Sequence, residues 1–231
     1  MKYVSPTICT LLALVPMTTN AEESKQRFDA TVSKQVGAPY LFVTPEGYDA
    51  AKKYPLLIFL HGRGEQGADL EKVTVHGPFA KVKELGLKLL IVAPQSPLDE
   101  WWDVDVLDAL VDHLLDTLPV DTDRVYLTGL SMGGHGAWQL AARRPETFAA
   151  IAPICGFSSP TKAAQLDGLP VWVFHGANDD VIRLGESSRM VHALYEAGNN
   201  ARLTVYPDAG HDSWTETYNN PKLYEWLLSH R

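Results

Sequence analysis

A serine flanked by glycines stands at the centre of residues 129–133, which read Gly-Leu-Ser-Met-Gly. The G-x-S-x-G pattern places its serine, here Ser131, on a sharp turn between a strand and a helix, where nearby backbone leaves no room for flanking side chains. The pattern alone also fits a glycine-rich turn with a capping serine. Residues 125–130 are strand-like and residues 132–143 are helix-like, which is the context that the motif requires. We therefore expect Ser131 to be a nucleophile.

A serine hydroxyl reacts poorly at neutral pH and needs a base, which a third group must hold in place. Four histidines follow Ser131 before the last turn of the chain: His135, His175, His192 and His211. His135 would point along its own helix, and His192 belongs to an amphipathic helix. His175 ends a strand, where a structural hydrogen bond is expected. His211 lies in the loop after the last strand and follows the candidate acids, so we expect it to be the base.

Two adjacent carboxylates, Asp179 and Asp180, follow the strand-like run at 171–174 and are the candidate orienting acids. Neighbouring loop residues point in different directions, so only one of the two is expected to reach the base. Spacing alone does not choose between them. Asp208 and Asp212 are too close in sequence to the base to approach its ring from behind, and their expected role is turn formation and capping.

Residues 60–64, Leu-His-Gly-Arg-Gly, follow the first strand that reads as buried. A loop in this position supplies one oxyanion donor to a nucleophile elbow, and the residue after the nucleophile supplies the other. We expect these donors to be the backbone N–H groups of Arg63 and Met132, each contributing about 2.7–4 kcal/mol in the transition state. The competing interpretation is a phosphate-binding loop, but no G-K-[ST] sequence follows.

The elements that must position these residues alternate between strand and helix. Residues 56–60 are a continuous apolar run, as expected of a strand covered on both faces. Residues 104–118 place leucines at helical spacing, with aspartates in the first turn and a proline after the end. The alternation predicts an α/β fold, with a mostly parallel sheet, helices on both faces and ligands at the carboxyl ends of the strands. The further predicted strands are 28–34 and 39–44 (antiparallel), 89–93, 148–154 and 201–206, and the further helices are 186–197 and 221–229.

Length and composition limit the function classes. The 231 residues suffice for a single large core, and 45% of them are hydrophobic. Lys and Arg total 20 against 28 Asp and Glu, which gives a net charge of −8 with no basic run. This balance argues against binding to nucleic acid or to an anionic membrane surface. No apolar stretch reaches the ~20 residues of a membrane span, and Cys9 and Cys155 are too few for a disulfide scaffold.

The N-terminal residues 1–21 have the layout of a secretory signal peptide. A short start containing Lys2 precedes an apolar core at 8–15, and small residues lead to a possible cleavage point after Ala21. The alternative is a frayed tail. We expect residues 22–231 to be the mature domain, exported to the periplasm or the exterior.

Taken together, these motifs resemble the α/β-hydrolase superfamily. More narrowly, they are similar to the lid-less bacterial carboxylesterases grouped with phospholipase/carboxylesterase, dienelactone-hydrolase-like and "predicted peptidase" proteins. The family pattern H-G-x-x-D implies that Asp179 is the acid. Arg183 departs from the proline of many relatives, and residues 73–79 align with no family feature. The resemblance extends from about Phe28 to the C terminus and rests on residues 60–65, 93–97, 129–134, 152–156, 175–179 and 210–212.

Three tryptophans are candidates for the substrate pocket. Trp101 and Trp102 follow the strand at 89–93 and either wall an acyl pocket or cover the core, and Trp214 is similarly ambiguous. Residues 156–168 form only a short excursion without an apolar stripe, so we expect no lid. An open site favours small, soluble or polymer-attached esters over long-chain triglycerides.

The sequence therefore predicts a serine carboxylesterase that cleaves short-chain or compact aromatic acyl esters through an acyl-enzyme, with no metal or organic cofactor. A serine peptidase is the alternative enzyme, although peptidases on this fold usually carry a large gating domain. A non-catalytic binding module is the third possibility, and the complete set of Ser131, Asp179 and His211 argues against it. The sequence leaves the oligomeric state open.

Overall fold

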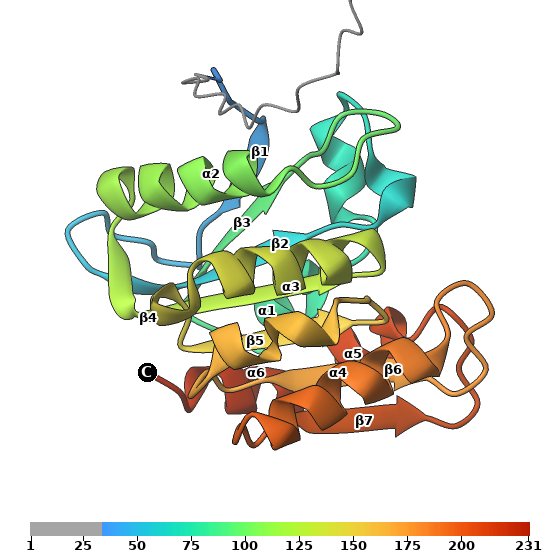
Figure 1. Ribbon diagram of the computed structural model, residues 1–231. Coiled ribbons are helices and arrows are strands. Elements are labelled where there is room, and N and C mark those ends of the chain that lie inside the picture. Colours follow the sequence, from blue (N-terminus) through green and yellow to red (C-terminus); the bar gives the residue numbers. More distant parts are fainter. Residues whose placement is uncertain (1–33) are drawn as a thin grey trace, which may run out of the picture. The chain divides into compact units, whose positions relative to one another are not determined.

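Seven strands form one sheet in the part of the chain that the structure, a computed structural model, describes, residues 34–231 (Figure 1). Their order is β1-β3-β2-β4-β5-β6-β7, and every neighbouring pair is parallel except β1 with β3. The predicted mostly parallel α/β sheet is therefore confirmed. The strands are β1 (Tyr40–Val43), β2 (Tyr54–Leu60), β3 (Leu90–Pro94), β4 (Val120–Leu130), β5 (Ala150–Ile154), β6 (Trp172–Gly176) and β7 (Arg202–Tyr206).

Helices cover both faces of this sheet. Buried residues of α2, α3 and α4 join one hydrophobic cluster, and those of α1, α5 and α6 join a second cluster on the opposite face. Figure 1 shows α2, α3 and α4 in front of the strands. The helices are α1 (Phe79–Glu84), α2 (Val104–Thr117), α3 (Met132–Arg143), α4 (Leu184–Glu196), α5 (Trp214–Asn219) and α6 (Pro221–Leu228), and the 3-10 turns are η1 (Arg63–Glu65), η2 (Leu70–Thr74), η3 (Pro145–Thr147) and η4 (Pro160–Leu166).

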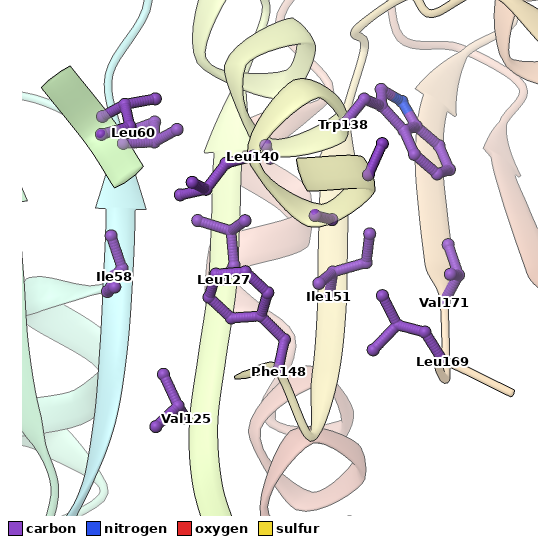
Figure 2. Packing of buried hydrophobic residues seen from close by; sticks show 14 of the residues in the cluster. Ile58, Leu60, Val125, Leu127, Trp138, Leu140, Phe148, Ile151, Leu169 and Val171 are labelled. Atoms are coloured by element: carbon purple, nitrogen blue, oxygen red, sulfur yellow. The ribbon is translucent and has the colours of Figure 1, made fainter. Parts of the chain in front are cut away.

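The apolar run of β2 is explained by this double cover. All seven of its residues are buried, with Ile58 and Leu60 in one cluster and Phe59 in the other. In Figure 2, side chains of neighbouring strands, including Leu127 of β4, meet Leu140 of α3 over the sheet. Because burying one such side chain contributes about 1.5–3 kcal/mol, this layer fixes α3 on the strands.

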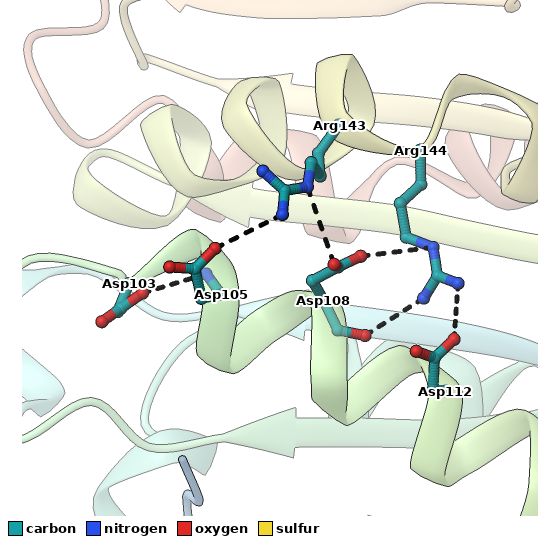
Figure 3. Close-up of polar contacts among 6 residues, drawn as sticks. All are labelled: Asp103, Asp105, Asp108, Asp112, Arg143 and Arg144. Atoms are coloured by element: carbon teal, nitrogen blue, oxygen red, sulfur yellow. Dashed lines mark hydrogen bonds and ion pairs between the residues drawn. The ribbon is translucent and has the colours of Figure 1, made fainter. Parts of the chain in front are cut away.

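Ion pairs also connect α3 to α2 (Figure 3). Arg143 contacts Asp105 at 3.5 Å and Asp108 at 3.6 Å, and Arg144 contacts Asp108 at 3.4 Å and also Asp112. Exposed pairs of this kind contribute about 0–1 kcal/mol each. Their effect is to hold the C-terminal end of the helix that starts beside Ser131 in a defined orientation.

The ladder between β5 and β6 is short. It consists of the pair Ile154 and Phe174 and an isolated bridge from Ile151 to Val171. By comparison, β4 and β5 pair continuously from Tyr126 with Ala150 to Leu130 with Ile154, so few β-ladder bonds join the two halves of the sheet.

Some sequence predictions differ from the structure, and others concern residues that it does not describe. The strand predicted at 39–44 forms as β1, but it pairs with β3, and its expected partner at 28–34 lies outside the described residues except for Lys34, which is not in a strand. The predicted signal peptide at 1–21 also lies outside them. The helices α1 and α5 were not predicted, and β4 starts at Val120 because it also pairs with Tyr54.

In the part of the chain that the structure describes, no large lid covers the carboxyl ends of the strands. The stretch at 156–168 holds only the turn η4. Within residues 34–231, no helix is long and apolar enough to cross a membrane.

Candidate active site

The expected nucleophile occupies a strained turn between β4 and α3. Ser131 has φ 52° and ψ −114°, a conformation that costs a non-glycine residue about 1–3 kcal/mol. A Cβ on Gly133 would lie 1.9 Å from the carbonyl oxygen of Leu60, and a Cβ on Gly129 would lie 2.4 Å from that of Gly133. Both glycines are therefore required for the close approach of backbone that presents Ser131 at the end of the strand.

Ser131, His211 and Asp179 form one continuous chain of hydrogen bonds. The Nε2 atom of His211 lies 2.9 Å from Ser131 Oγ, and Nδ1 lies 2.8 Å from Asp179 Oδ2. The other oxygen of Asp179, Oδ1, accepts the backbone N–H groups of Val181 and Ile182, each at 2.9 Å. With both oxygens occupied, the buried carboxylate is held in position and fixes the orientation of the imidazole.

The two candidate acids point in different directions, as expected. Asp179 is 7% exposed and faces His211, whereas Asp180 is exposed to solvent. His175 is fully buried behind the acid loop: its Nδ1 accepts from the Ser187 hydroxyl and its Nε2 donates to the Ile182 carbonyl, both at 2.7 Å. The expected structural role of His175 fits this arrangement.

The other two histidines lie away from the nucleophile's hydrogen bond. His135 Nδ1 lies 2.9 Å from the carbonyl oxygen of Phe157, and its ring stacks on that of Phe157 at 4.2 Å. Burial lowers the pKa of His135. His192 is exposed on α4.

The two backbone N–H groups expected to form the oxyanion hole belong to residues that each begin a helical segment. Met132 begins α3 and Arg63 begins η1, and N–H groups at such positions have no carbonyl partner within their helix. Both residues line the pocket that contains Ser131. The Arg63 side chain is 73% exposed, and its guanidinium lies 3.7 Å from Asp99 at the surface, so its charge points to solvent.

His61 holds the loop that carries Arg63. Its Nδ1 donates to the carbonyl oxygen of Gly62 at 2.6 Å and its Nε2 accepts from the backbone of Ser96 at 3.1 Å. Burial lowers the pKa of His61, which agrees with a neutral ring that both donates and accepts. Trp102 packs on this ring at 4.7 Å and donates to the His61 carbonyl. Trp102 is thus a core residue and does not line the pocket. Of the two roles that the sequence left open for it, covering the core is correct and walling the acyl pocket is not.

The pocket around Ser131 has a volume of about 620 Å³, within the usual range for small-molecule sites. Trp101 and Trp214 line it, as the sequence suggests. The Trp101 side of the pocket is aromatic: its ring lies edge-on to His135 at 5.5 Å and to Phe157 at 5.8 Å. Trp101 remains 55% exposed, so this aromatic surface is available to a ligand.

The sequence predicts no role for several other residues that line the pocket, among them Phe157. Glu65 stands in the motif at 60–65, and His76 belongs to the unaligned stretch at 73–79. Val181 and Ile182 follow the acid directly. In the sequence, only the position of Glu65, directly after the glycine-rich residues 62–64, could have indicated that it lines the pocket.

One group in the described part of the chain has metal-ligand composition: Cys155, Asp179 and His211, whose ligand atoms lie within 4.8 Å of one another. Burial raises the pKa of the Cys155 thiol to about 12, whereas metal binding requires a thiolate. Asp179 and His211 are already hydrogen-bonded to each other. These residues therefore do not fit a metal ion.

The profile of the dienelactone hydrolase family matches residues 97–223, more than half of the chain. The chain belongs to this family. The matched region contains Ser131, Asp179 and His211. The predicted resemblance to dienelactone-hydrolase-like α/β-hydrolases is thereby confirmed.

Esterases are among the proteins similar to this family member. The crystal structure of a thermostable esterase superposes with a TM-score of 0.76 at 32% identity, over 83% of this chain and 59% of that one. Feruloyl esterase C of Emericella nidulans is 27% identical over 154 residues, 64% of this chain and 57% of the fungal protein. The bifunctional acetylxylan esterase/xylanase XynS20E of Neocallimastix patriciarum is 27% identical over 57% of this chain and 20% of that protein. The chain spans less than two thirds of each relative, and the similarities support an ester-hydrolysing enzyme.

Proposed function

We propose that this dienelactone hydrolase family member is a serine carboxylesterase. The observation that carries the proposal is the hydrogen-bonded chain from Ser131 through His211 to Asp179. Ser131 Oγ attacks the ester carbonyl while His211 Nε2 takes its proton, and Asp179 stabilises the imidazolium that forms. The oxyanion accepts hydrogen bonds from the backbone of Arg63 and Met132.

The second half of the reaction uses the same groups. His211 returns the proton to the leaving alcohol, which departs and leaves the acyl group on Ser131. A water molecule then gives a proton to His211 and attacks the acyl carbonyl. When this second tetrahedral intermediate collapses, His211 returns the proton to Ser131 Oγ, which frees the carboxylic acid and restores both the serine and the neutral imidazole. Each proton thus has a donor and an acceptor among these groups.

The proposed substrates are esters with short or compact aromatic acyl groups, free or attached to a polymer. The aromatic surface of Trp101 and Phe157 beside Ser131 supports this proposal. One relative is named a feruloyl esterase and another an acetylxylan esterase/xylanase, and feruloyl and acetyl are compact acyl groups. The open pocket leaves room for the rest of a polymer to lie outside it.

The test compares wild type with Ser131→Ala on p-nitrophenyl acetate, methyl ferulate and acetylated xylan. Turnover is expected in wild type, with kcat lower by a factor on the order of 10⁶ in the variant. A fluorophosphonate probe should label wild type at Ser131, and Ser188→Ala, an exposed serine on α4, is the matched control. Undiminished activity of Ser131→Ala, or labelling at another residue, would refute the proposal.

We also propose that residues 22–231 are the mature protein and act outside the cytoplasm. The three-part layout of residues 1–21 supports this.

A further inference from the structure

A polar wall faces the nucleophile's pocket beside the aromatic surface. It consists of Glu65 in η1, His76 between η2 and α1, and Trp214 at the start of α5. None of these side chains takes part in the hydrogen-bonded chain from Ser131 to Asp179.

The carboxylate of Glu65 is buried with unused hydrogen-bonding capacity. The residue is 7% exposed, and its Oε2 atom is enclosed without a hydrogen-bond partner. Its Oε1 atom lies 3.7 Å from Nε2 of His76, within the range of an ion pair but beyond a hydrogen bond. Buried carboxylates are normally paired and hydrogen-bonded. The carboxylate therefore has unused acceptor capacity; Oε2 is enclosed, and Oε1 is the oxygen that lies toward His76.

His76 offers the matching donor and is reachable from solvent. Its side chain is 35% exposed, and its ring packs against Trp214 at 5.5 Å. Trp214 in turn lies edge-on to His211 at 5.3 Å. The wall thus runs without interruption from the expected base to Glu65, and a substrate held by His211 and Ser131 is close to it.

We propose that Glu65 and His76 bind a hydroxyl group of the ester substrate. A hydroxyl oxygen placed between Nε2 and Oε1 accepts a hydrogen bond from His76 and donates one to Glu65, and so bridges the 3.7 Å gap. A carbonyl group cannot donate and an ammonium group cannot accept, so neither completes both bonds. This inference rests on the proposed esterase function and adds a requirement to its substrate: a hydroxyl on either the aromatic acyl group or the alcohol.

Two matched pairs of esters distinguish these sources. Methyl 4-hydroxycinnamate against methyl cinnamate tests a hydroxyl on the acyl group, and glyceryl monoacetate against propyl acetate tests one on the alcohol. In wild type, kcat/KM should favour the hydroxylated member of one pair by about tenfold or more, as expected for a hydrogen bond to a charged group. Equal kcat/KM values within both pairs would overturn the inference.

His76→Phe retains a ring against Trp214 but removes the hydrogen-bonding nitrogen atoms, and should bring the preferred pair's ratio close to one. Glu65→Gln keeps the shape of the side chain but leaves only a neutral acceptor, and should lower the ratio by a smaller factor. Because the two groups hold one hydroxyl, the double variant should lose little more than His76→Phe alone. His192→Phe, at an exposed histidine of α4, is the matched control and should keep the wild-type ratio. A hydroxyl preference that survives both single substitutions would place recognition elsewhere.

Binding of the same uncleaved esters to Ser131→Ala, measured by calorimetry, separates this inference from the proposed function. Tighter binding of the hydroxylated member, lost with His76→Phe in the same background, supports the polar wall even if wild type hydrolyses no ester. Turnover in wild type without a hydroxyl preference would leave the esterase proposal in place and refute the role of Glu65 and His76.

Discussion

The Nε2 atom of His211 lies 2.9 Å from the Oγ atom of Ser131, although 80 positions separate the two residues in the chain. Ser131 follows β4, the central strand of the sheet, and His211 follows β7 at one edge. Asp179 comes from the loop after β6. The contact therefore depends on how the carboxyl ends of non-adjacent parallel strands are aligned. Because each residue comes from a different loop, substitutions in one loop should change activity or stability separately from those in another.

Asp179→Asn should reduce kcat far more than Asp180→Asn. An amide at position 179 favours the wrong imidazole tautomer of His211, and the loss can approach ~10⁴-fold. Asp180 is exposed and serves as the matched control, with a change of no more than a few-fold expected. Steady-state kinetics on one ester decides the matter, and the reverse order of effects would show that the other carboxylate orients the base.

Trp101→Ala and Trp102→Ala should have different consequences. Trp101 is exposed at the pocket, so its removal should enlarge the acyl site and shift the preferred chain length upward. Trp102 is buried, and its removal should lower the free energy of unfolding by about 3–5 kcal/mol. The measurements are kcat/KM from acetyl to palmitoyl esters and urea denaturation. A wild-type optimum at ten or more carbons, or an unchanged profile in Trp101→Ala, would contradict the assignment of this wall.

Ser131→Gly should be more stable than Ser131→Ala, although neither variant retains a nucleophile. The backbone at this position has φ 52°, which glycine adopts without strain and alanine does not. The difference in unfolding free energy should be about 1 kcal/mol or more. At Ser188, inside α4, the order should be reversed, because glycine costs about 1 kcal/mol relative to alanine in a helix. Equal stabilities of the two variants at position 131 would argue against a strained turn.

The mature protein should begin at Glu22 and be found outside the cytoplasm. N-terminal sequencing of the protein from fractionated cells of its native host provides the measurement. Replacing Ala21 with a bulky residue should slow cleavage, because signal peptidases require small residues at this point. An intact Met1 on cytosolic protein would refute the prediction.

Local patterns predicted the fold and the turn at Ser131 well. The apolar run at 56–60 predicted a strand covered on both faces, and β2 occupies 54–60. The turn at Ser131 could be predicted because its motif specifies backbone geometry, and α3 begins at the next residue. The loops that carry Asp179 and His211 could be placed because parallel strands bring their carboxyl ends to one edge.

The orientation of single side chains could not be predicted in the same way. Trp101 and Trp102 are neighbours in sequence, yet one is exposed at the pocket and the other is 9% exposed in the core. Their long-range contacts distinguish them: Trp102 packs on His61, whereas Trp101 lies against His135 and Phe157. His76 lies in a stretch without periodicity, so nothing local indicates that it faces Glu65.

The short ladder between β5 and β6 affects the order in which parts of this protein unfold. Ser131 lies on the β5 side of this ladder, while Asp179 and His211 lie on the β6 side, after β6 and β7. Regions joined by few backbone hydrogen bonds open at lower free energy than the globally unfolded state. A local opening along this line separates the serine from both of its partners while the layers around β2 and β4 stay folded. In denaturant, the contact between Ser131 and His211 is therefore expected to break before the core melts.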